Sequence, residues 1–188
     1  MSESDAITIY QPAEDSYLLD KILRQEIPSL IKSNPDIRFL EIGAGSGILL
    51  ETAKDLGIKD KNIFATDINQ EAVSHCQELG FSNCILSDLF KEVEGQYNII
   101  VFNPPYLPRD KDNLEPAESQ LATTGGASGS EIINKFLGQA KDYLEENGKI
   151  YLLTSSLTEE IDWKDYHQKL LGKEKLFMEE LFVWELGL

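Results

Sequence analysis

The stretch IIVFNPPY, residues 99–106, decides how this chain folds. Its first four residues are apolar and mostly β-branched, a composition that indicates a buried strand. Proline fixes φ and has no N–H, and the residue before a proline is held out of the helical region, so no helix or strand can continue beyond Phe102. Asn103 and Tyr106 are therefore predicted to lie in a rigid loop at the carboxyl end of a strand, where open α/β sheets bind ligands.

The composition of the 188-residue chain is that of an ordinary globular protein, with 41% hydrophobic and 27% charged residues. We expect a single domain over residues 1–188, with residues 1–36 contributing to the ligand site. No apolar run has the roughly 20 residues needed to span a bilayer, and the start MSESD is acidic where a signal peptide is basic. Cys76 and Cys84 have no metal-binding or disulfide-framework spacing, so no metal is predicted. The expectation is a soluble, cytoplasmic protein.

The formal net charge of −16 argues against a nucleic-acid-binding protein. Such a protein needs clustered Lys and Arg side chains to displace counterions from phosphates, and no run of the sequence supplies them. The acidity either only keeps the protein soluble, the commoner case, or attracts a basic protein partner or substrate.

Hydrophobic periodicity predicts strands that alternate with helices. The predicted strands cover residues 37–42, 62–67, 83–86, 97–102 and 149–154. The predicted helices cover residues 17–27 (ending near Pro28), 48–56, 69–79, 130–146 and 158–171. Residues 174–178 and 181–186 are expected to pair as antiparallel strands. The predicted fold is α/β: a doubly wound, mostly parallel seven-stranded sheet with helices on both faces and a C-terminal antiparallel strand pair.

Right-handed crossovers place the carboxyl ends of the five parallel strands along one edge of this sheet. The polar segment over residues 104–128 is long for a loop without structure of its own, and such loops usually bind or cover a ligand.

A glycine turn with the sequence EIGAGSG, residues 41–47, follows the first strand and opens a helix. Glycines allow the backbone to turn tightly against a ligand, and a helix N-terminus favours negative groups. The spacing differs from the Gly-x-Gly-x-x-Gly of dinucleotide-binding proteins. Glu41 would repel a pyrophosphate, and it suits a cationic amino group instead.

Two more acidic residues end the next two strands. Asp67 lies roughly 20 residues beyond the glycine turn, where an acidic side chain accepts from both hydroxyls of a ribose. Asp88 can accept from an exocyclic amine. Each acid alone is more often a helix cap or a solvated loop residue, but three at successive strand ends indicate a binding site. They imply an adenosine that carries an ammonium group and no polyphosphate, and S-adenosyl-L-methionine fits this description.

The glycine turn, Asp67, Ser87-Asp88 and the NPPY sequence at residues 103–106 together resemble the class I S-adenosyl-L-methionine-dependent methyltransferases, which have a Rossmann-like fold. In that superfamily, NPPY occurs in enzymes that methylate planar nitrogens, either the amide of glutamine or the amine of adenine. The resemblance therefore implies both the cofactor and the class of acceptor.

Two further segments, YQPAEDS at residues 10–16 and TGG at residues 124–126 leading into GSEII at 129–133, resemble the archaeal and eukaryotic branch of the HemK-type protein-(glutamine-N5) methyltransferases. Bacterial HemK-type enzymes have a helical domain before the glycine turn, and this chain has one helix there. The resemblance implies that the substrate is the Gly-Gly-Gln loop of a class-1 translation termination (release) factor. Thr123-Thr124 departs from the Ala-Trp expected before the paired glycines.

The resemblance also implies which residues bind the cofactor. They are Ser16, Glu41, Gly43, Gly45, Asp67, Asp88, Leu89 and Asn103. Within this set, Glu41 is expected at the methionine part, Asp67 at the ribose and Asp88 at the adenine. Glu14 and Asp15 either belong to the site or shape the N-terminal turn.

The catalytic residues are expected to be Asn103, Pro104 and Tyr106. An amide nitrogen is a poor nucleophile because its lone pair is delocalised into the carbonyl. The Asn103 side-chain oxygen and the Pro104 carbonyl would accept from its two N–H groups and hold it in line with the methyl sulfonium, with Tyr106 packed on the flat amide. Because the prolines fix both oxygens beforehand, the gain is mainly in orientation, which can reach several kcal/mol.

Two other functions are compatible with these residues. An adenine-N6 methyltransferase acting on DNA or RNA also has NPPY, but the chain lacks a basic patch. A non-catalytic cofactor-binding subunit would have no chemical need for Asn103 or the glycine turn. The resemblance further implies a heterodimer with a small zinc-binding activator protein that covers an apolar sheet edge, for which residues 84–86 are the candidate.

Overall fold

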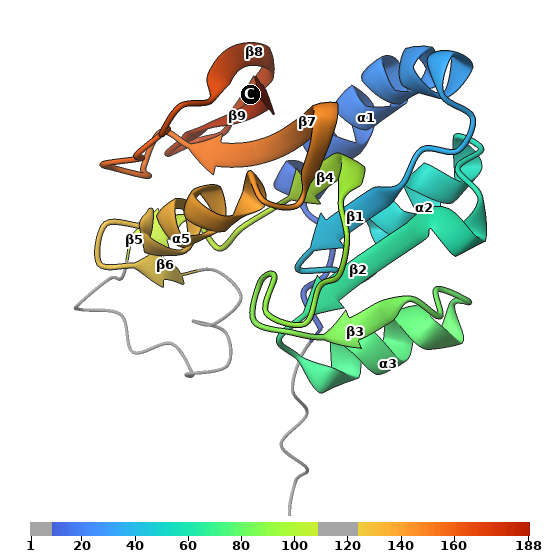
Figure 1. Ribbon diagram of the computed structural model, residues 1–188. Coiled ribbons are helices and arrows are strands. Elements are labelled where there is room, and N and C mark those ends of the chain that lie inside the picture. The colour runs from blue at the N-terminus through green and yellow to red at the C-terminus, as the bar shows by residue number, and fades with distance from the viewer. Residues whose placement is uncertain (1–8, 109–123) are drawn as a thin grey trace, which may run out of the picture.

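A computed structural model of the chain describes residues 9–108 and 124–188. Its main sheet has seven strands in the order β3 (Cys84–Leu86), β2 (Ile63–Asp67), β1 (Phe39–Ile42), β4 (Tyr97–Phe102), β7 (Leu144–Ser155), β9 (Glu180–Gly187) and β8 (His167–Lys175), from the bottom to the top of Figure 1. The first five are parallel, and β9 is antiparallel to both of its neighbours. The predicted fold class is thereby confirmed.

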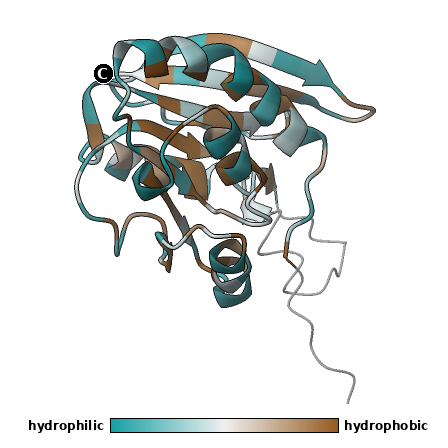
Figure 2. Cartoon of the chain, turned by 90° about the vertical axis from the view of Figure 1, so that its right-hand side faces the viewer, coloured by the Kyte–Doolittle hydropathy of each residue, from teal (hydrophilic) through white to brown (hydrophobic). Residues whose placement is uncertain are grey.

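Helices cover both faces of the sheet. They are α1 (Glu14–Ser33), α2 (Ile48–Asp55), α3 (Gln70–Glu78) and α5 (Glu131–Ala140), with a short 3₁₀ helix η1 (Asp60–Asn62) before β2. The first three helices contribute to one hydrophobic cluster, and α5 contributes to a second cluster on the opposite face. Figure 2 shows the hydrophobic residues concentrated in the central strands that lie between these layers. Helices on both faces of a mostly parallel sheet make this a doubly wound arrangement.

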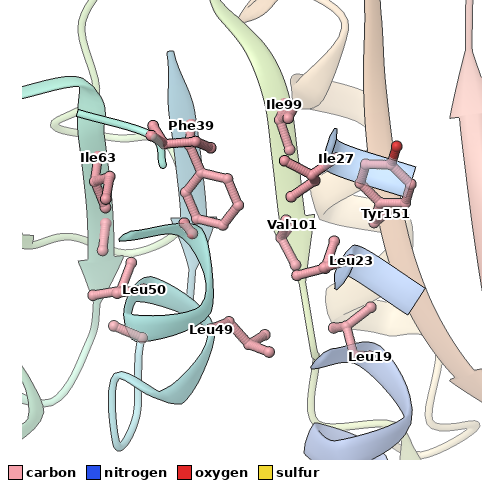
Figure 3. Close-up of a cluster of buried hydrophobic side chains, with 14 of the residues drawn as sticks. Leu19, Leu23, Ile27, Phe39, Leu49, Leu50, Ile63, Ile99, Val101 and Tyr151 are labelled. Atoms are coloured by element: carbon pink, nitrogen blue, oxygen red, sulfur yellow. The ribbon is translucent and has the colours of Figure 1, made fainter. Parts of the chain in front are cut away.

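Alternation along β4 explains why its apolar run is continuous. Ile99 and Val101 face the cluster under α1, whereas Ile100 and Phe102 face the cluster under α5. A strand that is buried on both faces needs apolar residues at every position. Figure 3 shows Leu23 of α1 next to Val101 of β4.

The predicted end of the first helix near Pro28 is wrong, because α1 continues to Ser33. An internal proline removes one helical hydrogen bond and strains the preceding turn. Residues on both sides of Pro28 nevertheless pack on the same cluster, namely Ile27 before it and Leu30 and Ile31 after it. Burial of this continuous apolar face outweighs the local cost of the proline.

Two predictions on the C-terminal half are also wrong. The helix predicted to Glu146 ends at Ala140, because Leu144 already pairs with Tyr97 as the first residue of β7. The helix predicted over residues 158–171 is absent from the described chain, and β8 begins at His167. Most side chains of β8 are exposed, so its hydrophobic pattern carries little information. Its conformation is set by pairing with β9, a tertiary contact that local periodicity does not reveal.

The polar segment over residues 104–128 is described only at its two ends. Leu107–Pro108 (β5) and Thr124–Gly126 (β6) pair as a small parallel sheet. Residues 109–123 of the predicted binding loop lie outside the described residues. Among the helices that the structure describes, none is both long and apolar enough to cross a membrane.

We predict that Leu23→Ala lowers the free energy of unfolding by about 2–5 kcal/mol, because it leaves a cavity where α1 packs on β4 and Leu23 is fully buried. Lys21→Ala changes an exposed residue of the same helix and should shift the free energy by less than about 0.5 kcal/mol. Urea denaturation measures both variants. Equal destabilisation by the two changes would contradict the packing described for α1.

Candidate functional site

A cavity of about 490 Å³ opens at the carboxyl ends of β1 to β4. All ten site residues predicted from the sequence line it: Ser16, Glu41, Gly43, Gly45, Asp67, Asp88, Leu89, Asn103, Pro104 and Tyr106. Parallel strands account for this convergence, because their carboxyl ends lie at one edge of the sheet. The structure brings the predicted residues together, and their individual roles stay predictions.

The glycine turn is fastened to the end of β2. Gly43, Gly45 and Gly47 have φ values of 73°, 50° and 79°, a region that favours glycine. The Gly43 N–H donates to the Thr66 carbonyl at 2.7 Å, and the Gly45 N–H donates to Asp67 Oδ2 at 2.9 Å. The turn therefore lies flat against the cavity, with its backbone fixed before any ligand arrives.

Glu41 is a buried carboxyl group with an unused acceptor. Its side chain is 2% exposed, and Oε2 has no hydrogen-bond partner within the described structure. Burial raises the pKa of Glu41 well above its ordinary value, and the nearby Cys76 and Asp67 raise it further. A cationic group in the cavity would favour the ionised carboxylate and so lower the pKa of Glu41 again.

Asp67 and Asp88 lie in different environments. Asp67 is nearly buried, and it accepts from the backbone N–H groups of Gly45 and Asn69. Burial raises its pKa, while these hydrogen bonds oppose the rise. Asp88 lies at the exposed rim, where Oδ2 accepts from Lys135 Nζ at 2.7 Å. The cavity thus has an acidic floor at Glu41 and Asp67 and a charge-neutralised rim at Asp88.

Leu89 adopts a left-handed conformation, with φ of 53°, directly after this rim. The Ser87 hydroxyl holds the turn, because it donates to the Leu89 carbonyl at 3.0 Å and accepts from the Glu92 N–H at 3.1 Å. The turn brings the largely buried Leu89 side chain to the cavity wall.

The carboxamide of Asn103 is oriented by the start of α1. Its Nδ2 donates to Asp15 Oδ2 at 3.2 Å and to Ser16 Oγ at 3.5 Å. Its Oδ1 is buried and has no partner within the described structure. Asp15, which the sequence left between site and turn, therefore belongs to the site, and it is 5% exposed.

Tyr106 is half-buried beside this group. Burial raises the pKa of its phenol far above the ordinary value, and the negative charges of Asp15 and Glu179 raise it further. The phenol stays protonated at physiological pH, so it does not act as a base. Thr158 Oγ1 donates to the Tyr106 carbonyl at 3.0 Å and anchors the end of the loop.

The glycine-rich segment over residues 125–129 packs against the backbone of the Asn-Pro-Pro-Tyr loop. A Cβ added at Gly125 would lie 2.5 Å from the Pro105 carbonyl oxygen and 2.1 Å from that of Gly129. A Cβ at Gly129 would lie 2.4 Å from the Tyr106 carbonyl oxygen. These glycines are required because two backbones approach closely. Paired glycines outside a helix were the available signal for this contact, but the sequence does not identify the opposing chain.

Comparisons with known proteins identify the family of this chain. The family model described as the methyltransferase small domain matches residues 21–176. A Methanocaldococcus jannaschii protein assigned to the N5-glutamine methyltransferases is 38% identical over 157 residues, which cover 81% of this chain and 75% of that protein. The release factor glutamine methyltransferase of Streptococcus pneumoniae is 31% identical over 166 residues, or 81% of this chain and 59% of that protein.

Among solved structures, that of the E. cuniculi Mtq2–Trm112 complex, responsible for methylating the eRF1 termination factor, matches with a TM-score of 0.67. The match covers 94% of this chain and 96% of that chain at 22% identity, and it establishes the fold. The family model covers most of the chain, and the archaeal relative exceeds 30% identity over most of its length. The chain therefore belongs to the methyltransferase small domain family.

Proposed function

We propose that this protein uses S-adenosyl-L-methionine to methylate N5 of the glutamine side chain in the Gly-Gly-Gln loop of a class-1 release factor. The observation that carries the proposal is the buried, unpartnered Asn103 Oδ1 in the same cavity as the unpartnered Glu41 Oε2. One acceptor suits an ammonium group and the other suits an amide N–H. The names of the archaeal and streptococcal relatives support glutamine as the acceptor.

The residues present fit this cofactor. Glu41 Oε2 is a free acceptor for the ammonium of the methionine part. Asp67 keeps unused lone pairs for ribose hydroxyls, since a carboxylate has about four acceptor positions and two backbone N–H groups occupy it. Ser16, Asp88 and Leu89 line the remaining wall. When bound, the cofactor supplies an electrophilic methyl group on a sulfonium.

Positioning of the amide is assigned to the Asn-Pro-Pro-Tyr loop. The Asn103 oxygen and the Pro104 carbonyl accept from the two N–H groups, and the neutral Tyr106 ring packs on the amide plane. Holding the nitrogen in line with the methyl group lowers the activation barrier, because the loss of orientational freedom and the reorganisation of solvent have already taken place on binding. No general base is needed before attack. The methyl–sulfur bond would break as the new N–C bond forms, leaving a neutral thioether, and the amide proton would then pass to solvent water.

A small zinc-binding activator is proposed to complete the enzyme as a heterodimer in the cytoplasm. The edge strand β3 has only three residues, and its Ile85 and Leu86 are 37% and 48% exposed. Exposed apolar strand edges are sites of association. The E. cuniculi Mtq2 structure is that of a complex with Trm112, which supports a protein partner.

Incubation with methyl-labelled cofactor tests the acceptor, with and without the small zinc-binding partner. We expect label on a class-1 release factor, and we expect it to vanish when the loop glutamine is replaced by glutamate. Adenine-containing oligonucleotides should stay unlabelled, because a chain of net charge −16 repels phosphates. Label on the oligonucleotides alone would establish an adenine methyltransferase, and no label in any reaction would establish a non-catalytic subunit.

We predict that Glu41→Gln weakens cofactor binding by about 10- to 100-fold. This change corresponds to the loss of a hydrogen bond to a charged group, which contributes roughly 1.5–3 kcal/mol. The pKa of Glu41 is raised in the free protein, and a bound ammonium lowers it again. Parental affinity should therefore be full above the raised pKa and fall as the pH drops through it. Isothermal titration calorimetry from about pH 5 to 7.5 measures both proteins. An identical pH dependence in the variant would contradict the role of Glu41.

We predict that Gly125→Ala lowers kcat by about 100-fold, since a misplacement of about 1 Å at a distant support has effects of this size. The new Cβ meets two carbonyl oxygens of the backbone and displaces the Asn-Pro-Pro-Tyr loop. Gly138→Ala is the matched control, because a Cβ there meets nothing within 4 Å. Steady-state kinetics should give the control a parental kcat. A parental kcat for both variants would contradict the supporting role of Gly125.

A further inference from the structure

The buried carboxylate of Asp15 is the centre of a partly buried network in which every partner is a donor. Oδ1 accepts from the Ser16 N–H at 2.6 Å, and the Tyr10 hydroxyl donates to both oxygens at 2.9 and 2.8 Å. Oδ2 also accepts from Asn103 Nδ2 at 3.2 Å. An ionised carboxylate has no proton to donate, so it selects donors on all sides.

The network decides which end of the Asn103 carboxamide is available to a ligand. A carboxamide has a donor end and an acceptor end. The donor end is held by Asp15 Oδ2 and Ser16 Oγ, while the acceptor end is buried without a partner in the described structure. The opposite orientation would place the Asn103 oxygen against the carboxylate, where like charges repel.

Tyr10 holds the Asp15 carboxylate in place. Burial raises the pKa of Tyr10 far above its ordinary value, and the negative charge of Asp15 raises it further. The phenol therefore remains a donor throughout the physiological range. Its hydroxyl bridges both carboxylate oxygens, which prevents the Asp15 side chain from rotating away from Asn103.

We propose that Asp15 is a positioning residue that holds the donor end of Asn103, so that only its oxygen faces the substrate. The inference rests on the proposed function, because it assigns the selectivity of that site. An oxygen fixed toward the cavity accepts from the N–H of glutamine and repels the carboxylate of glutamate. Discrimination between the two side chains then comes from an unfavourable contact with the wrong one as well as a hydrogen bond to the right one.

Asp15→Asn is a sharp test because the structure specifies where the new nitrogen goes. The Ser16 N–H holds Oδ1 at 2.6 Å, so the oxygen of the new amide takes this position. The nitrogen takes the position of Oδ2 and faces Asn103 Nδ2, donor against donor. The Asn103 carboxamide must then turn over, which directs its NH₂ group into the cavity.

Kinetics should show this reversal. We expect Asp15→Asn to lower kcat by about 100-fold, the size seen when one oriented hydrogen-bonding group is lost at a reacting centre. Asp20→Asn, the same chemical change on an α1 side chain paired with Arg24, is the control and should keep the parental kcat. A parental kcat in Asp15→Asn would overturn the proposal.

The reciprocal double variant separates positioning from a merely structural role. In Asp15→Asn combined with Asn103→Asp, the new amide donates to the new carboxylate, whose other oxygen faces the cavity. We expect kcat to recover at least about 10-fold over Asp15→Asn alone, although the N-terminal change is the same in both. A double variant no more active than Asp15→Asn would overturn the proposal.

Nuclear magnetic resonance of the free protein gives a readout that needs no substrate. The side-chain NH₂ signals of Asn103 are identified by their loss in Asn103→Asp. We expect these protons to exchange with water slowly in the parent and at least about 10-fold faster in Asp15→Asn, because they then face the cavity. Unchanged exchange would overturn the positioning role even in an active methyltransferase. The expected change in a protein that methylates no glutamine would leave the positioning role intact and refute the proposed function instead.

Discussion

The hydrogen bond from Asn103 Nδ2 to Asp15 Oδ2 joins residues that are 88 positions apart in the chain, and the site depends on it. One end is fixed because two prolines end β4 and fasten the following loop. The other end is fixed because α1 packs along the sheet through an apolar face that continues past Pro28. A helix that stabilises the core therefore also delivers the group that orients the central side chain of the cavity.

The site also contains two buried hydrogen-bond acceptors that have no partner within the described structure. A buried acceptor without a partner costs about 1–3 kcal/mol, more when it is charged. Glu41 Oε2 and Asn103 Oδ1 both have this property within the described structure. The raised pKa of Glu41 expresses the same cost, because the buried carboxyl favours its neutral form. A ligand that presents an ammonium and an amide N–H relieves both at once, so the free protein gives up stability for selective binding.

Much of this arrangement follows from local sequence. Continuous apolar runs and glycines that end helices predicted the sheet, and acids at strand ends predicted Glu41, Asp67 and Asp88 at its edge. The resemblance to the HemK-type methyltransferases implied the other residues around the cavity. The failures share one cause, which is dependence on distant contacts. β8 is a strand because β9 pairs with it, and α1 passes Pro28 because the core covers both sides. The positions of Asp15 and Gly125 depend on backbone and side-chain groups that no local pattern identifies.

A crystal structure with S-adenosylhomocysteine and a Gly-Gly-Gln peptide is the most direct test of the central claim, that a preset acceptor selects the glutamine nitrogen. We predict that the glutamine Nε2 lies about 2.7–3.2 Å from Asn103 Oδ1, while Asn103 Nδ2 remains bonded to Asp15. A glutamine bound with its oxygen toward Asn103, or an Asn103 side chain that has left Asp15, would contradict it.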